Sequence, residues 1–158
     1  MGTTPQWIAN EAARAEQQRV ASEASAQQAI EDSFTIQKQG PAFWKELLES
    51  LTLNTDALPQ LPDGFKGRTS RLGDWQCQIE VSKTGMIPNL RQINLFYNPG
   101  SPVIRACANA LDSQEVHFAF VVSRKGELCI RRETGPIMNA SEMAESLTHG
   151  MVNALRRD

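Results

Sequence analysis

Apolar and polar residues alternate in five short runs between Asp74 and Glu133, which predicts five β-strands with one buried face each. Short turn sequences separate the runs, among them residues 98–101 and residues 124–126. Runs joined by such short turns pair antiparallel. The pattern therefore predicts a five-stranded antiparallel meander, and it leaves open one short edge strand within residues 65–72.

The pairing register follows from the turns, because a slip of one residue would move every apolar side chain to the wrong face. We pair Tyr97 with Pro102 and Ala108 with Val116, and we close the last hairpin at residues 124–126. This register gives one continuous apolar face. The residues that it predicts to be buried are Trp75, Ile93, Leu95, Ile104, Phe118 and Phe120.

Helices are predicted on both sides of the sheet sequence. Residues 6–38 are rich in the good helix formers Ala, Glu, Gln and Arg, and Gly40-Pro41 is expected to end this helix. A short helix at 42–53 and a C-terminal helix at 140–157 carry apolar stripes. Their predicted core residues are Trp44, Leu47, Leu51, Leu147 and Met151. The fold class is α+β, with the helices packed on one sheet face.

The predicted domains are a helical arm, residues 1–38, and a single α+β domain, residues 39–158. A helix over residues 6–38 is about 50 Å long at 1.5 Å per residue. The remaining residues form a body with a radius of gyration of roughly 13–14 Å. We therefore expect the arm to pair with another chain, with fraying as the alternative.

Composition and charge narrow the classes of function. The 158 residues carry a net charge of −2, so there is no basic signature of nucleic-acid binding. Residues 1–63 hold 4 basic and 9 acidic groups (net −5), whereas residues 64–158 hold 12 and 9 (net +3). No apolar run reaches the roughly 20 residues that span a membrane. Three cysteines, an odd count, favour free thiols and a cytoplasmic protein, and removal of a signal sequence stays open.

The outer sheet face holds the only candidate for chemistry. The predicted register places Gln92, Cys107, His117 and Glu133 side by side on four strands. A thiol, an imidazole and a carboxylate in a row resemble an activated nucleophile, and Gln92 could donate to an oxyanion. A polar solvated face accounts for the same residues, so we treat Cys107, His117 and Glu133 as weak catalytic candidates. No metal-ligand spacing is present, and we predict no metal site and no cofactor.

Two further rows of this outer face suggest a ligand or partner surface. Asn94, Arg105 and Arg131 fall in one row, and Phe96, Val103 and Val121 fall in the next, beside Cys129. Arginines suit an acidic partner, and an apolar outer row is typical of a covered face.

Two functions of different class follow. We favour a non-enzymatic protein-interaction or assembly module that forms a homodimer or binds a protein partner through the N-terminal helix and the outer face. Nucleic acid and membrane are not expected partners. The alternative is a small-molecule-binding domain or enzyme that uses either the Cys107/His117/Glu133 row or the Arg105/Arg131 pair.

Overall fold

The computed structural model describes residues 2–85, 89–108 and 115–157 and contains two compact units, Met1–Phe34 and Thr35–Asp158. The first unit is helical, within helix α1 (Gln6–Ala57), and the second holds the rest of α1 and all other elements. In chain order these elements are η1 (Leu58–Gln60), β1 (Phe65–Gly73), β2 (Gln76–Lys83), β3 (Asn89–Tyr97), β4 (Val103–Ala108), β5 (Glu115–Val122), β6 (Leu128–Arg132) and α2 (Ala140–Arg157). The α+β class is confirmed.

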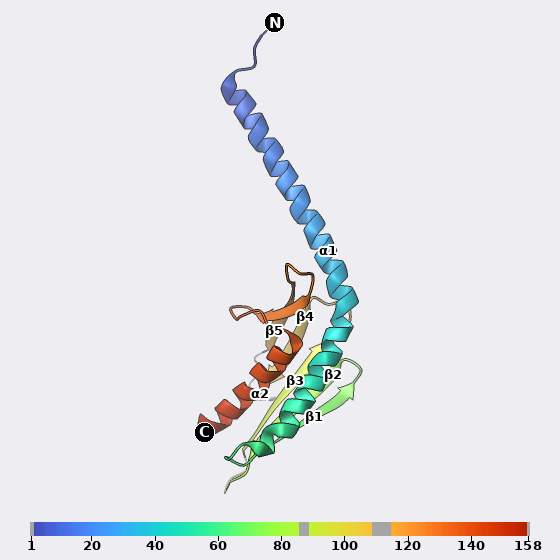
Figure 1. Cartoon of the computed structure of the whole chain (residues 1–158), viewed down its shortest axis with the longest axis vertical. Coiled ribbons are helices and arrows are strands. Elements are labelled where there is room, and N and C mark those ends of the chain that lie inside the picture. The colour runs from blue at the N-terminus through green and yellow to red at the C-terminus, as the bar shows by residue number, and fades with distance from the viewer. Residues whose placement is uncertain (1, 86–88, 109–114, 158) are drawn as a thin grey trace. The chain divides into compact units, whose positions relative to one another are not determined.

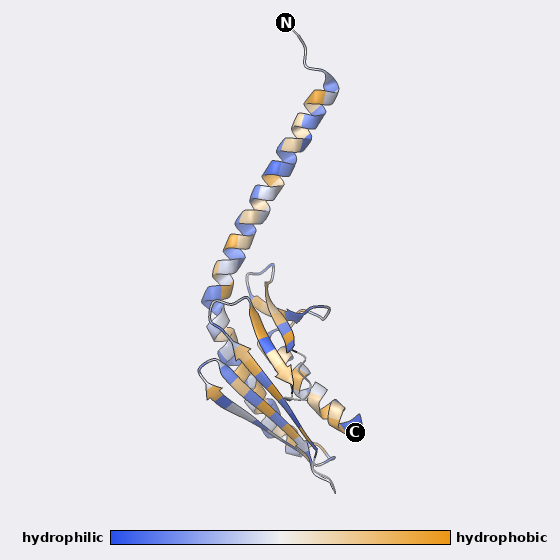
Figure 2. Cartoon of the chain, turned by 180° about the vertical axis from the view of Figure 1, so that it is seen from behind, coloured by the Kyte–Doolittle hydropathy of each residue, from blue (hydrophilic) through white to orange (hydrophobic). Residues whose placement is uncertain are grey.

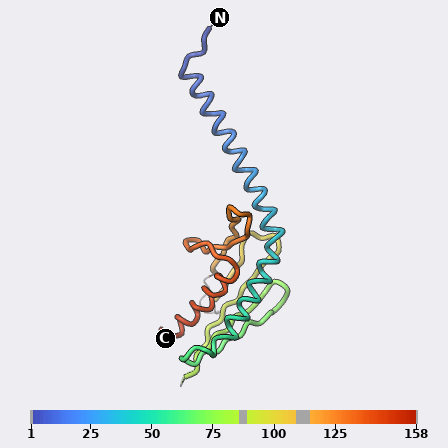
Figure 3. Tube along the Cα trace, in the orientation of Figure 1, coloured from blue at the N-terminus to red at the C-terminus, as the bar shows by residue number. Residues whose placement is uncertain are grey.

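The sheet of the second unit is an antiparallel meander in which the strands lie in chain order from β1 to β6 (Figure 3). The structure thus has six strands, one more than the predicted meander, because residues 65–73 form a full edge strand. Residues 35–57 of α1 and all of α2 lie on one face of the sheet (Figure 1). The other face, seen in Figure 2, is the open face of the following description.

Large apolar side chains from both helices fill the space above the covered face. Leu95, Ile104, Phe118 and Phe120 are buried as predicted, and Ile93 packs against this core while partly exposed. The helical core residues Trp44, Leu47, Leu51 and Met151 are also buried, and Leu147 is partly buried. Burial of a side chain of this size contributes roughly 1.5–3 kcal/mol.

The predicted burial of Trp75 is wrong, because this side chain is 37% exposed. Trp75 lies in the turn before β2, where its carbonyl accepts a bond from the Tyr97 amide at 2.9 Å. Its ring meets the edge of the Tyr97 ring with centroids 5.4 Å apart. Trp75 therefore covers one end of the core instead of filling it.

The predicted register is shifted by two residues at two strand pairs. Tyr97 pairs with Ile104 instead of Pro102, and Val116 pairs with Ala106 instead of Ala108. Pro102 has no N–H to give to the β3–β4 ladder, and β4 begins one residue later. A shift of two residues leaves each side chain on its predicted face, so the prediction of which strand residues face the core stays correct. The last hairpin is as predicted, with Phe120 opposite Ile130 and Gly126 at φ +78°.

The predicted helix break at Gly40-Pro41 is wrong, since α1 runs through Pro41 without interruption. A proline inside a helix removes one backbone bond and costs about 3 kcal/mol. The residues that follow offset this cost, because Phe43, Trp44 and Leu47 are buried against the sheet. The Trp44 and Tyr97 rings stack with centroids 5.7 Å apart, which fixes the helix at this point.

Gly40 allows α1 to approach Tyr97 closely. A Cβ atom on Gly40 would overlap the Tyr97 hydroxyl oxygen and would lie 3.2 Å from the adjacent ring carbon. That hydroxyl is buried and has no hydrogen-bond partner among the described residues. Burial also raises the pKa of Tyr97 above its ordinary value.

Two other features position the sheet edges and α2. β1 carries a bulge between Arg71 and Gly73. Beside β6, Met138 exchanges two backbone hydrogen bonds with Ile130, at 2.7 and 2.8 Å. A capping box begins α2: the Asn139 side chain accepts from the Glu142 amide at 2.8 Å, and the Glu142 carboxylate accepts from the Asn139 amide.

We predict that Gly40→Ala lowers the free energy of unfolding by roughly 1–3 kcal/mol, because the added methyl overpacks the contact with Tyr97. At a helix position without this contact, the same change is stabilising. Tyr97→Phe should raise stability by about 1 kcal/mol, since it removes a buried hydroxyl without a partner. Urea unfolding of the two single variants and the double variant tests the coupling. Additive effects, with no recovery of Gly40→Ala by Tyr97→Phe, would contradict the proposed contact.

Candidate functional site

The open face of the sheet carries the residues singled out from the sequence, in an order set by the observed register. One row holds Asn94, Cys107 and Glu115, and the next holds Phe96, Arg105 and His117. Each row crosses β3, β4 and β5, and side chains of neighbouring strands in a row have Cβ atoms about 4.5–5.5 Å apart. The open face therefore combines charged, polar and aromatic side chains.

The predicted row of Gln92, Cys107, His117 and Glu133 is not formed. Cys107 faces Asn94 and Glu115, because the β3–β4 and β4–β5 pairs are both shifted by two residues. His117 lies opposite Arg105 and so in the next row. Glu133 follows the end of β6 at an exposed position. The thiol and the imidazole are thus not the directly opposed pair that the nucleophile hypothesis requires.

Gln92 belongs to a separate polar ladder on the same face. Its side-chain amide donates to a Glu80 carboxylate oxygen at 2.8 Å, and Arg68 Nη2 lies 3.8 Å from the other oxygen of that carboxylate. The three residues connect β1, β2 and β3. Gln92 is therefore engaged two strands away from His117 and is not placed to stabilise an oxyanion there.

Arg105 lies at the centre of a compact charged group on the open face. Its Nη1 donates to Glu115 Oε1 at 3.2 Å, and its guanidinium carbon lies 5.4 Å from the centroid of the Phe96 ring. His117 Nε2 lies 3.6 Å from the second oxygen of Glu115. One carboxylate thus contacts both an arginine and a histidine, and it offsets much of the charge of Arg105. Glu115 was not singled out from the sequence, although its spacing of two from His117 places both on one face.

Arg131 differs from Arg105, because its side chain has no hydrogen bond or ion pair with any part of the chain that the structure describes. It is exposed on β6, opposite Ala119. Val103, Val121 and Cys129 are half-buried near it on the same face. This corner of the open face joins an unpaired cation to a partly apolar surface.

Two of the three thiols, Cys77 and Cys129, are poorly suited to nucleophilic chemistry. Burial raises the pKa of Cys77 to about 12, so this thiol stays protonated at neutral pH. Burial, followed by the charges of Glu127 and Glu142, also raises the pKa of Cys129. All three cysteines are free thiols. Within residues 2–85, 89–108 and 115–157, no group of three or more His, Cys, Asp or Glu side chains is arranged to hold a metal.

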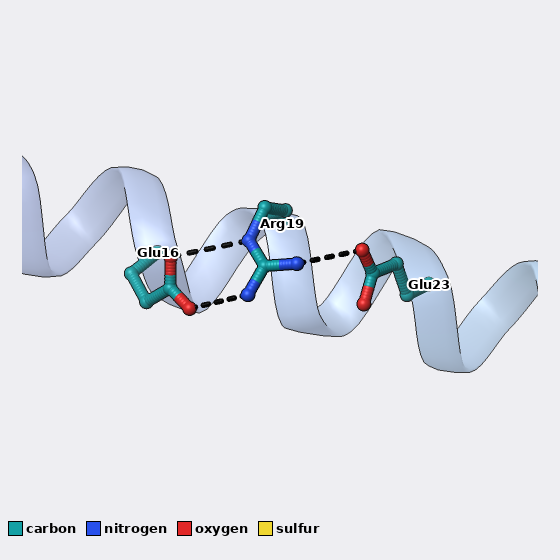
Figure 4. A network of polar contacts seen from close by, with 3 residues as sticks. All are labelled: Glu16, Arg19 and Glu23. Atoms are coloured by element: carbon teal, nitrogen blue, oxygen red, sulfur yellow. Dashed lines mark hydrogen bonds and ion pairs between the residues drawn. The ribbon is translucent and has the colours of Figure 1, made fainter.

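The N-terminal unit, taken by itself, is a helix with exposed apolar side chains and local ion pairs. Arg19 bridges Glu16 and Glu23, with its Nε 3.1 Å from one Glu16 oxygen and its Nη1 2.7 Å from Glu23 (Figure 4). The Arg19 bond lowers the pKa of Glu16. Such pairs support a helix but bury nothing. Trp7 and Phe34 are each 68% exposed.

Comparisons with known proteins add no assignment, because no family model, no curated protein and no solved structure matches this chain. No helix among the described residues is long and apolar enough to cross a membrane.

We predict that Cys107 reacts slowly with iodoacetamide at pH 6 and that His117→Ala leaves its rate unchanged, because the imidazole does not face the thiol. Peptide mass spectrometry resolves the three cysteines, with buried Cys77 as the internal unreactive control. Fast labelling of Cys107 at pH 6 that depends on His117 would restore the nucleophile hypothesis.

Proposed function

We propose that this chain is a non-enzymatic assembly module that forms a homodimer through its N-terminal helical unit and its open face. The observation that carries the proposal is the exposure of apolar side chains on the helix of residues 6–34. This helix forms the N-terminal unit by itself, so no other element of that unit can cover them. Ile30 is 53% exposed and Phe34 is 68% exposed. A single helix of mostly polar residues is marginally stable in water and gains most of its stability from docking.

The positions of the apolar side chains suit a helical contact. Ala13, Val20 and Phe34 are separated by multiples of seven residues, so they share one side of the helix, with Ile30 one turn from Phe34. Burying Val20, Ile30 and Phe34 in a partner would contribute roughly 1.5–3 kcal/mol each. That gain is large relative to the free energy of an isolated helix.

Charge supports a second copy of the chain as the partner. Residues 6–34 hold 5 acidic and 2 basic groups, a net charge of −3. Among the described strand residues, the open face holds four basic side chains, Lys66, Arg68, Arg105 and Arg131, and two acidic ones, Glu80 and Glu115. An acidic helix with an apolar stripe matches a basic face with the partly apolar corner at Val103 and Val121. We place the module in the cytoplasm, in keeping with its three free thiols.

The alternative of an enzyme or small-molecule binder on the open face has less support. Cys107 and His117 fall in different rows, and Arg105 is engaged with Glu115 and Phe96. Arg131 is the cation of the Arg105/Arg131 pair that keeps no partner among the described residues. An exposed arginine left without a partner among the described residues favours a protein surface over a ligand site.

We predict a dimer for the full-length chain in multi-angle light scattering and at least a tenfold weaker dimer for Ile30→Gln combined with Phe34→Gln. Glutamine keeps the helix propensity while it removes apolar surface. Leu53→Gln is the matched control, because Leu53 is also an exposed apolar residue of α1, at 72%, but lies in the second unit.

A second pair of variants tests the open face. Arg131→Glu should weaken the dimer, whereas Arg124→Glu, which makes the same charge change in the exposed β5–β6 hairpin, should not. A full-length chain that stays monomeric at high concentration would refute the assembly proposal. A dimer that withstands the Ile30/Phe34 change would refute the role of the helix.

A further inference from the structure

The covered side of the sheet contains a cavity of about 370 Å³ between the sheet and α2. Ile93, Ala108 and Phe118 line it from the sheet, and Leu147, Met151 and Ala154 line it from α2. The size falls within the range of small-molecule sites, which are typically 300–1,000 Å³ and mostly apolar. Gln92, on the open face, is also among its lining residues, whereas none of the residues proposed above for assembly lines it.

Small side chains account for the space. On β4, Ala108 lines the cavity, and its partner on β3 is the larger Ile93. On α2, Gly150 lines the cavity in the interior of the helix, where glycine is unfavourable relative to alanine. No atom lies within 4 Å of the position that a Gly150 Cβ would occupy. Ala108 and Gly150 are both exposed, so the apolar space is open to solvent at these two small residues.

The charges around the cavity have one sign. Among its described lining residues are Arg91 and Arg132, and none is an aspartate or a glutamate. The Arg132 side chain makes no hydrogen bond or ion pair with the described residues, whereas Arg91 has an interaction of its own. Arg132 pairs across the ladder with Phe118, so this exposed residue lies at the β6 side of the apolar lining, and it also lines a second pocket with Glu115 and Glu133. A guanidinium in this place suits a carboxylate.

The length of the lining indicates what else the ligand carries. The cavity extends from Arg132 on β6 to Ile93 on β3, which is three strand spacings, or about 14 Å, across the sheet and four residues, or about 13 Å, along it. A carboxylate bound at Arg132 would therefore be followed by apolar walls across β5, β4 and β3. We propose that this cavity binds an amphipathic monocarboxylate of the medium-chain fatty-acid type, with its head group on Arg132 and its chain between the sheet and α2.

Isothermal titration calorimetry of the full-length chain with sodium decanoate tests the proposal, at concentrations below those at which decanoate forms micelles. We expect saturable binding with one site per chain. In the series hexanoate, octanoate and decanoate, affinity should rise about fourfold for each added methylene, as expected for methylenes that leave water. Decan-1-ol, which lacks the charge, should bind at least tenfold more weakly than decanoate.

Two variants with matched controls locate the site. Arg132→Gln should weaken decanoate binding at least tenfold, while Arg124→Gln, in the exposed β5–β6 hairpin outside the lining, should not change it. Gly150→Leu should abolish binding, because the leucine side chain would fill the open space at this position. The helix should tolerate the change, because leucine has a higher helix propensity than glycine. Ser141→Leu adds the same side chain at an exposed position of α2 outside the lining and should bind as the unchanged protein does.

Three results would overturn the proposal. The first is the absence of saturable binding for every carboxylate of the series. The second is an equal loss of affinity in Arg124→Gln and Arg132→Gln, which would indicate nonspecific attraction to a basic surface. The third is unchanged binding in Gly150→Leu with circular dichroism equal to that of the unchanged protein, which would place the ligand outside this cavity.

Discussion

The contact between α1 and the sheet depends on four aromatic side chains. Phe43 and Trp44 come from the helix, and Tyr97 and Phe120 come from strands β3 and β5. The Phe43 and Phe120 rings meet edge to face with centroids 5.3 Å apart, a favoured geometry for aromatic pairs. These contacts begin two residues after Pro41 and hold the helix in place where its own hydrogen bonding is weakest. The close approach of Gly40 to Tyr97 is a direct result.

The helix and strand classes could be predicted from the sequence because they depend on local periodicity. Residue parity is the strongest part of that signal: Leu95, Ile104 and Phe118 were assigned to the correct face even though their partners were two residues away from the predicted ones. The length of a turn, by contrast, depends on which residues form the first backbone hydrogen bonds between its two strands. The alternation of apolar and polar residues does not determine those residues. The continuity of α1 at Pro41 depends on aromatic residues 56 and 79 positions further on, which no local pattern contains.

The candidate chemistry was predicted less well, for the same geometric reason. A core face tolerates an even shift of register because one apolar residue replaces another. A pair such as Cys107 and His117 does not tolerate that shift, because the residue opposite the thiol becomes Glu115 instead of His117. The cavity beside α2 escaped sequence reasoning because its signal is the smallness of Ala108 and Gly150, and small residues also occur at many positions that line no cavity.

The strand order has a consequence for how the chain folds. All five pairings of the sheet join strands that are consecutive in the sequence, so each forms by closing a short loop at small entropic cost. Such local contacts give a low contact order, and sheets of this kind fold faster than those with crossing connections. Residues 43–51 and α2, which pack on the covered face, also lie directly before and after the sheet in the sequence. Few long-range searches remain, which shortens the time during which the apolar face is exposed to other chains.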